Sequence, residues 1–150
     1  MNSIDWLFIQ RKVRFGECDS AGVMHFYHLF RWAHESWEES LDCYGIEVKD
    51  IFPSSFQFNE VIFPIVNSEA KFFNPIKFGD LLTIKIMPTK INSHLFKIDS
   101  SFFLQENHKV AECKLIHCSI SSSSRKKVSF PDQLELWIEA SNIQNKVKEC

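Results

Sequence analysis

The sequence predicts an α+β fold in which one long helix packs on one face of an antiparallel sheet. Two patterns carry this prediction. Apolar residues recur at helical spacing between Phe26 and Tyr44, and apolar and polar residues alternate in three later segments between residues 82 and 120. One helix followed by a run of strands is typical of this class. A chain of 150 residues favours a single domain, which we expect to span residues 1–150.

The first predicted elements are a short strand and the long helix. We expect the strand at residues 12–15 and the helix at about residues 26–43, with Gly45 as its C-terminal stop. One face of this helix is apolar and the other is polar. The apolar face is expected to comprise Phe26, Phe30, Ala33, Trp37, Leu41 and Tyr44, and the polar face His28, Arg31, Glu35, Glu38 and Asp42.

The remaining predicted elements are strands and a second helix. An apolar, β-branched stretch at residues 56–66 predicts a strand that Pro64 kinks or interrupts. Residues 82–87 alternate as a half-buried strand, and residues 96–104 and 110–120 should pair as a hairpin around an Asn107-His108 turn. A C-terminal helix beginning near Pro131 would bury Leu134, Trp137 and Ile138.

Composition and charge exclude several classes of function. Apolar residues make up 45% of the chain, which favours a compact core over disorder. The formal net charge of -2 supplies no global field for nucleic acid, so we expect no nucleic-acid partner. No run of about 18 or more apolar residues occurs, so no membrane span is expected. Five cysteines without a Cys-x-x-Cys pair, and an N-terminus without a secretory pattern, predict reduced thiols and a cytoplasmic protein.

The most informative segment for function runs from Phe15 to Phe26. It places Asp19 in a turn of small residues just before the long helix, and Gly22 permits backbone shapes that a Cβ would forbid. The unpaired N–H groups at the start of the helix point back at the turn, so a bound carbonyl would meet these donors and Asp19 together. The alternative is that Asp19 only caps the turn backbone, which is a common use of Asp before a helix.

Two groups of residues could suggest a metal, and neither has a convincing pattern. His25, His28 and His34 lack a nearby carboxylate or cysteine constellation. Cys113 and Cys118, with His117 between them, are explained more simply by strand alternation, in which a free thiol packs as a small apolar side chain. We expect no metal site.

These segments resemble the hotdog-fold acyl-CoA thioesterases of the 4-hydroxybenzoyl-CoA thioesterase family. The first similar block is Asp-x-x-Gly-Val before an aromatic-rich helix. A second block and a tail are similar as well, and the likeness covers most of residues 10–131. The second block comprises Phe63-Pro64-Ile65-Val66, Ala70-Lys71-Phe72-Phe73-Asn74-Pro75 and Phe78-Gly79-Asp80-Leu81-Leu82. The tail comprises Ile116-His117-Cys118, Arg125-Lys126-Lys127 and Pro131, and the pair His34-Glu35 is similar as well.

The resemblance implies a hotdog fold, with an antiparallel sheet wrapped around the long central helix, and hydrolysis of an aromatic acyl-CoA thioester for quinone biosynthesis. Asp19 occupies the position at which the family carries its catalytic carboxylate. This carboxylate either attacks the thioester carbonyl or acts as a general base on water. The backbone amide of Phe26 is expected to polarise the carbonyl. Gly22 and Val23 are expected to contact substrate, and His25 either lines the acyl pocket or orients Asp19. Thioester hydrolysis needs no metal or redox cofactor, so no cofactor is expected.

The resemblance also implies how CoA binds and how the subunits assemble. Lys90 and Ser93 in one turn, and Arg125 and Lys126 after a serine stretch, are candidates for the CoA phosphates, although basic loop residues are often only solvated surface. Family members form dimers and commonly tetramers with active sites at subunit boundaries. We therefore expect a homodimer or homotetramer in which residues after about 60 complete a neighbour's site.

Two alternatives to this function stay open. One is a thioesterase for 4-hydroxybenzoyl-CoA or another short acyl-CoA, although the 4-hydroxybenzoyl-CoA branch carries an aromatic hydroxyl residue where this chain has Phe26. The other is a noncatalytic module that binds acyl-CoA or an acyl carrier protein.

Overall fold

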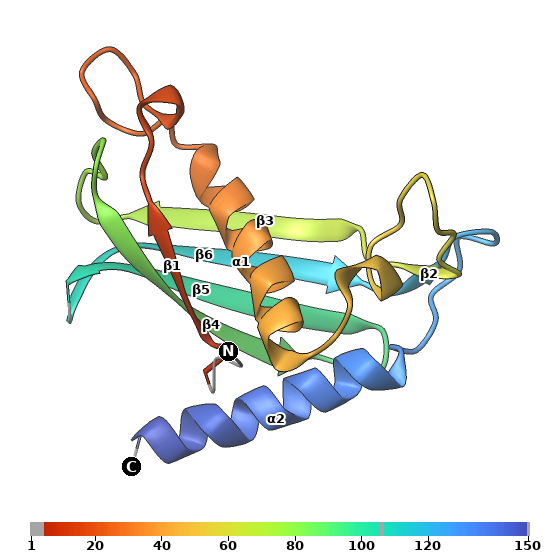
Figure 1. The fold of residues 1–150 in the computed structure, drawn as a ribbon. Helices are drawn as coiled ribbons and strands as arrows, with labels where there is room; N and C mark the ends of the chain where they lie inside the picture. The colour runs from red at the N-terminus through yellow and green to blue at the C-terminus, as the bar shows by residue number, and fades with distance from the viewer. Residues whose placement is uncertain (1–4, 106, 150) are drawn as a thin grey trace.

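The computed structural model describes residues 5–105 and 107–149. Five strands form one sheet in the order β1-β4-β5-β6-β3, with every neighbouring pair antiparallel. The long helix α1 lies across one face of this sheet (Figure 1), which confirms the predicted α+β class. The sheet comprises β1 (Phe8–Lys12), β3 (Ile65–Phe72), β4 (Leu81–Lys90), β5 (Leu95–Gln105) and β6 (His108–Cys118).

Helix α1 (His28–Tyr44) begins two residues later and ends one residue later than predicted. Gly45 ends it as expected, with a φ of 109°. Its amide donates to the carbonyl oxygens of Leu41 at 3.1 Å and Asp42 at 3.0 Å. Glycine reaches this left-handed conformation without the steric cost that other residues meet.

The buried face of α1 differs from the predicted one. His28 was expected on the polar face, but it is only 7% exposed. Ser36 and Ser40 also lie on the buried face, where Ser36 Oγ donates to the Trp32 carbonyl at 2.7 Å and Ser40 Oγ accepts from Trp137 Nε1 at 3.2 Å. Because His28, Trp32, Ser36 and Ser40 are spaced four residues apart, they share one side of the helix. The sequence pattern missed this face because half of it is polar.

The core lies between α1 and the inner face of the sheet. The predicted alternation in β4 and β5 is confirmed, because the side chains on one face are buried and those on the other are not. The hairpin of β5 and β6 is confirmed too, with Asn107 at a φ of 69° in its turn. Buried apolar residues of the two strands are Leu82, Ile84, Ile86, Phe96, Ile98 and Phe102.

Two predicted strands are corrected by the structure. The strand expected at residues 12–15 ends at Lys12, and Phe15–Glu17 form a 3-10 turn, η1, because the Glu17 carboxylate accepts the Arg14 amide at 2.9 Å. Of residues 56–66, residues 56–60 lie in no strand. Val61–Ile62 form β2, which pairs with β7 (Ile120–Ser121), and the chain breaks at Pro64 as predicted before β3 begins.

Helix α2 (Asp132–Glu149) begins next to the predicted position and buries Leu134, Trp137 and Ile138 as expected. A further 3-10 turn, η2, spans Val48–Asp50. Within the described residues, neither helix is long and apolar enough to cross a membrane. Cys18, Cys43, Cys113 and Cys118 are free thiols, and Cys150 lies outside the described residues.

Candidate active site

Residues 17–25, called the acid loop below, fold into a tight hairpin around Asp19. The Asp19 amide donates to the Val23 carbonyl at 2.8 Å, and the Gly22 amide donates to the Asp19 carbonyl at 3.0 Å. Asp19 Oδ1 accepts the amides of Ala21 at 2.9 Å and Val23 at 3.1 Å. One carboxylate oxygen therefore caps the turn, as the alternative interpretation expected. The other oxygen, Oδ2, forms no hydrogen bond with any described residue, and the side chain is half-buried.

Gly22 gives the acid loop its shape. Its φ of 78° lies in the left-handed region, where a Cβ would strain the backbone. Its carbonyl accepts the Phe78 amide at 2.8 Å, and the Met24 amide donates to Ile76 at 2.9 Å. These bonds hold the acid loop against the turn that precedes β4.

The Phe26 amide, expected to act as a donor, lies two residues before α1 rather than inside it. The His28 amide is paired with His25 and the Leu29 amide with Phe26. The backbone N–H groups of Phe26 and Tyr27 have no acceptor among the described residues. Both groups lie at the positive end of the α1 dipole, so they can bind a carbonyl oxygen that gains negative charge.

An open apolar cavity of about 330 Å³ adjoins the acid loop. Val23 and Met24 form its wall on the loop side, and Phe26, which is 66% exposed, lies beside them. Asp19 itself does not line the cavity. A volume of this size is within the range of small-molecule pockets. The rest of the lining is formed by Phe72, Phe73, Asn74, Pro75 and Ile76.

Among the described residues, no histidine of this region forms a hydrogen bond with the Asp19 carboxylate. His25 is exposed, its ring stacks on Tyr27 at 5.8 Å, and it makes no hydrogen bond with Asp19 among the described residues. His28 packs between Tyr27 and Trp32, and burial lowers its pKa, which favours the neutral ring. Neither expected role of His25 is visible in one chain.

The thiol next to Asp19 is not an alternative nucleophile. Burial, followed by the negative charges of Glu17, Asp19 and Asp80, raises the pKa of Cys18. A protonated thiol is a poor nucleophile, so Cys18 is a weak candidate for the reacting group.

A family model described as the thioesterase-like superfamily matches residues 13–138. The chain belongs to the thioesterase-like superfamily. A 1,4-dihydroxy-2-naphthoyl-CoA hydrolase of Prochlorococcus marinus subsp. pastoris is 61% identical over 151 residues, which cover 100% of both chains. The hotdog fold implied by the resemblance is confirmed by the match and by the solved structures that superpose on this chain.

Two of these solved structures are informative. A putative thioesterase from Prochlorococcus marinus MIT 9313 is 42% identical, with a TM-score of 0.88 and coverage of 94% of this chain and 99% of that one. A 1,4-dihydroxy-2-naphthoyl-CoA thioesterase from Synechocystis is 25% identical, with a TM-score of 0.80 and coverage of 88% and 94%.

In this thioesterase-like chain, the expected CoA-binding residues lie far from the acid loop. The acid loop is next to the start of β4, because the Phe78 amide, three residues before that strand, donates to the Gly22 carbonyl at 2.8 Å. Lys90 is at the other end of β4. Ten residues of strand span roughly 30 Å. Figure 1 shows the loop of residues 121–127 at the end of the sheet opposite the acid loop.

The four expected CoA residues do share one end of the sheet. The Ser119 amide donates to the His94 carbonyl at 2.7 Å, which joins the turn of Ser93 to the segment leading to Arg125 and Lys126. Lys90 Nζ pairs with Glu135 at 2.5 Å, so its charge is partly neutralised. Arg125 and Lys126 are exposed and have no ion pair with a described residue.

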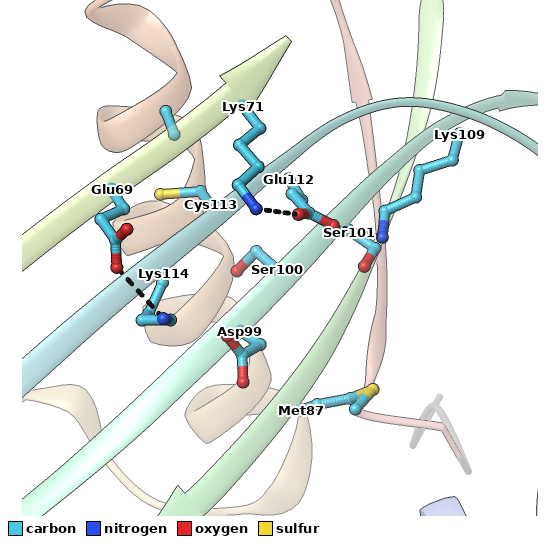
Figure 2. Close-up of a pocket in the computed structure, with 11 residues that line it drawn as sticks. Glu69, Lys71, Met87, Asp99, Ser100, Ser101, Lys109, Glu112, Cys113 and Lys114 are labelled. Atoms are coloured by element: carbon cyan, nitrogen blue, oxygen red, sulfur yellow. Dashed lines mark hydrogen bonds and ion pairs between the residues drawn. The ribbon is translucent and has the colours of Figure 1, made fainter. Parts of the chain in front are cut away.

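A second groove, of about 270 Å³, crosses the face of the sheet away from α1 (Figure 2). Its charges are paired: Lys114 with Glu69 at 3.1 Å, and Lys71 with Glu112 at 3.8 Å. Its one thiol, Cys113, is unreactive because burial raises its pKa to about 12. Over the described residues, no cluster of His, Cys, Asp and Glu could hold a metal ion.

The sequence pattern missed Glu17, which is buried at the base of the acid loop with only 6% exposure. Burial alone raises the pKa of its carboxyl. Hydrogen bonds with the Arg14 amide, the Arg11 guanidinium and the Trp32 indole outweigh that effect and hold the pKa below its ordinary value. The sequence does show a charged residue two positions before Asp19. Its role could not be predicted, because its side-chain partners Arg11 and Trp32 come from other parts of the chain.

Proposed function

We propose that this chain hydrolyses 1,4-dihydroxy-2-naphthoyl-CoA to 1,4-dihydroxy-2-naphthoate and CoA, in the biosynthesis of phylloquinone or menaquinone. The observation that carries the reaction type is Asp19. Among the described residues, one of its carboxylate oxygens has no hydrogen-bond partner, and its loop leads directly to the Phe26 amide, which has no acceptor there either. The acyl group is supported by the relative named for this substrate, which is 61% identical over the whole chain.

Two routes are open to Asp19 Oδ2. As a nucleophile it adds to the thioester carbonyl, the C–S bond breaks with release of CoA thiolate, and water then hydrolyses the mixed anhydride. As a general base it takes a proton from a water that attacks the same carbonyl. In both routes negative charge grows on the carbonyl oxygen, where the Phe26 N–H stabilises it. A donor of this kind contributes roughly 10²–10³ in rate.

The acyl group would lie in the cavity beside the acid loop. Its aromatic wall of Phe26, Phe72 and Phe73 suits a planar bicyclic ring. Gly22 and Val23 would bring the loop backbone close to the thioester, since Val23 lines the cavity and Gly22 sets the turn.

The CoA nucleotide would bind to a neighbouring subunit. Lys90, Ser93, Arg125 and Lys126 lie roughly 30 Å along the sheet from the acid loop of their own chain, so they would serve the acid loop of a partner. This arrangement requires at least a homodimer, and a homotetramer is compatible with it.

Strand β3 supplies a physical reason for assembly. It is an edge strand, paired on one side only with β6, and its side chains are exposed on both faces. Ile65 is 48% exposed, Val66 58% and Phe72 47%. An open edge strand of this length, with exposed apolar side chains at both ends, favours pairing with a second copy. With four described free thiols, the cytoplasm is the compartment that we propose.

A panel of thioesters tests the function. The purified protein is assayed for CoA release from 1,4-dihydroxy-2-naphthoyl-CoA, 4-hydroxybenzoyl-CoA, benzoyl-CoA and short-chain acyl-CoAs. We expect the highest kcat/KM for the dihydroxynaphthoyl ester. A higher value for 4-hydroxybenzoyl-CoA or a short acyl-CoA would favour the alternative thioesterase, and binding of these esters without turnover would favour a binding module. Single-turnover hydrolysis in ¹⁸O-water then tests the nucleophilic route, because label enters Asp19 only when water attacks a mixed anhydride at the Asp19 carboxyl carbon.

A further inference from the structure

Glu17 is a buried carboxylate with every oxygen occupied. Its Oε1 accepts from Arg11 Nη2 at 2.8 Å and from Trp32 Nε1 at 3.1 Å, and its Oε2 accepts the Arg14 amide at 2.9 Å. A charge is buried in this way only when its partners replace water. Because no oxygen is free and the side chain is only 6% exposed, Glu17 cannot reach a substrate.

The main chain of Glu17 closes the acid loop. The His25 amide donates to the Glu17 carbonyl at 3.0 Å, and the next pair inward, Cys18 and Met24, forms a β-bridge. Asp19 therefore follows Glu17 by two residues on one side of the hairpin. Phe26, whose amide is free, follows the other end of the same hydrogen bond.

The side chain of Glu17 anchors this closed end to two elements. Arg11 comes from β1 and Trp32 from α1, and the Arg11 guanidinium also lies 5.5 Å from the Trp32 ring. Arg11 Nη1 binds Glu35 of α1 at 2.5 Å. The hairpin base is thus held by one strand and one helix through a single carboxylate.

We propose that Glu17 is a positioning residue that fixes the Asp19 carboxylate relative to the Phe26 amide. This inference rests on the proposed function, because it assigns these two groups to the reaction. Hydrogen bonds from three donors, two of them on other elements, set the base of the loop. Misplacement of a reacting group by about 1 Å can cost about 100-fold in rate.

Glu17→Gln is the variant that tests the proposal. Its amide NH₂ would face Arg11, Trp32 or the Arg14 amide, which are all donors, so the base of the loop must shift. We expect kcat to fall by about 10- to 100-fold, with KM changed by less than about threefold. Glu112→Gln is the matched control. Glu112 is also a carboxylate, and its hydrogen bond with Lys109 lowers its pKa, but it lies in the groove on the face of the sheet away from α1. Its kcat should be that of the wild type.

The double variant Glu17→Gln/Asp19→Asn separates positioning from general damage. If Glu17 acts through Asp19, its substitution costs little further kcat once Asp19 is neutral. An equal loss of kcat in both backgrounds, or a Glu17→Gln enzyme with wild-type kcat, would overturn the proposal. Thermal unfolding of each variant shows whether a loss of kcat comes from unfolding of the protein. If Glu17→Gln unfolds, Glu17→Asp, which keeps the charge, is measured instead, and we expect it to recover part of the wild-type kcat.

A readout without turnover keeps this inference distinct from the proposed function. In ¹H–¹⁵N spectra, Glu17→Gln should shift the amide signals of Gly22, Val23 and Phe26, and Glu112→Gln should not. If the wild-type protein hydrolyses no thioester, the proposed function fails while these shifts still decide whether Glu17 sets the loop. Unmoved signals would contradict the positioning role whatever the activity.

Discussion

Asp19 and Val23 are joined twice: the Asp19 amide donates to the Val23 carbonyl at 2.8 Å, and the Val23 amide donates to Asp19 Oδ1 at 3.1 Å. These two bonds orient the carboxylate with one oxygen held and the other free. The same side chain therefore caps a turn and remains able to react, so the two interpretations of Asp19 are compatible.

The first prediction concerns Gly22, whose φ of 78° allows this double contact. Gly22→Ala places a Cβ in a left-handed conformation, which costs about 1–2 kcal/mol. We expect Tm to fall by about 3–6 °C and kcat to fall with it, because the loop shifts. Gly16→Ala is the control, since Gly16 has no positive φ and open space around its Cβ position. Equal Tm values for the two variants would contradict the account.

The second prediction concerns Arg125 and Lys126. Replacing both with Gln should raise KM for CoA esters about tenfold, because charged hydrogen bonds to phosphate are lost, and should leave kcat unchanged. A pantetheine thioester without the nucleotide should show no such change. Lys49→Gln, in an exposed lysine paired with Glu47, serves as the control. An unaltered KM for CoA esters would mean that the nucleotide binds elsewhere.

The third prediction concerns assembly through β3. Val66→Lys places a charge on the open edge, so we expect smaller species by sedimentation velocity. The activity on CoA esters should fall as well, because the CoA residues would come from the partner. Ile143→Lys changes an equally exposed apolar residue of α2 and should keep the assembly of the wild type. An unchanged assembly of the Val66→Lys protein would refute pairing through this edge.

The fourth prediction concerns pH and His117. Its ring is fully buried against Phe96, and burial lowers its pKa to about 4, from an ordinary value near 6.5 when unfolded. As the pH falls, His117 is therefore protonated in the unfolded chain before it is protonated in the folded protein. The contribution of neutral His117 to the free energy of unfolding is complete above about pH 6.5 and is lost as the pH falls through about 4. The total loss is about 3 kcal/mol.

His117→Phe removes this titration. Urea unfolding at pH 7, 5.5 and 4.5 should show a smaller loss of unfolding free energy with acid in the variant than in the wild type. Identical pH dependence in the two proteins would show that His117 does not titrate across this range.

Local signals predicted much of the fold and the position of the acid. The Gly45 stop, the alternation in β4 and β5 and the break at Pro64 each depend on a few neighbouring residues, and each is present. Asp19 and Gly22 were likewise found from their spacing within one turn. Such features need no knowledge of distant partners.

Features that depend on distant contacts were missed. β3 carries the polar run Asn67–Lys71 and buries neither face, so no alternation marked it as a strand. His28 was placed on the polar face because Ser36 and Ser40 conceal the buried one. Glu17 gains its role from Arg11 and Trp32, and the CoA residues would need a second subunit, which no pattern in one chain displays.

Steady-state hydrolysis by the Asp19→Asn variant tests the central claim most directly. With 1,4-dihydroxy-2-naphthoyl-CoA as substrate, we expect kcat to fall by about 10²–10⁴, while KM and Tm stay close to those of the wild type. A folded Asp19→Asn protein that releases CoA at the wild-type rate would contradict the claim that this carboxylate carries the reaction.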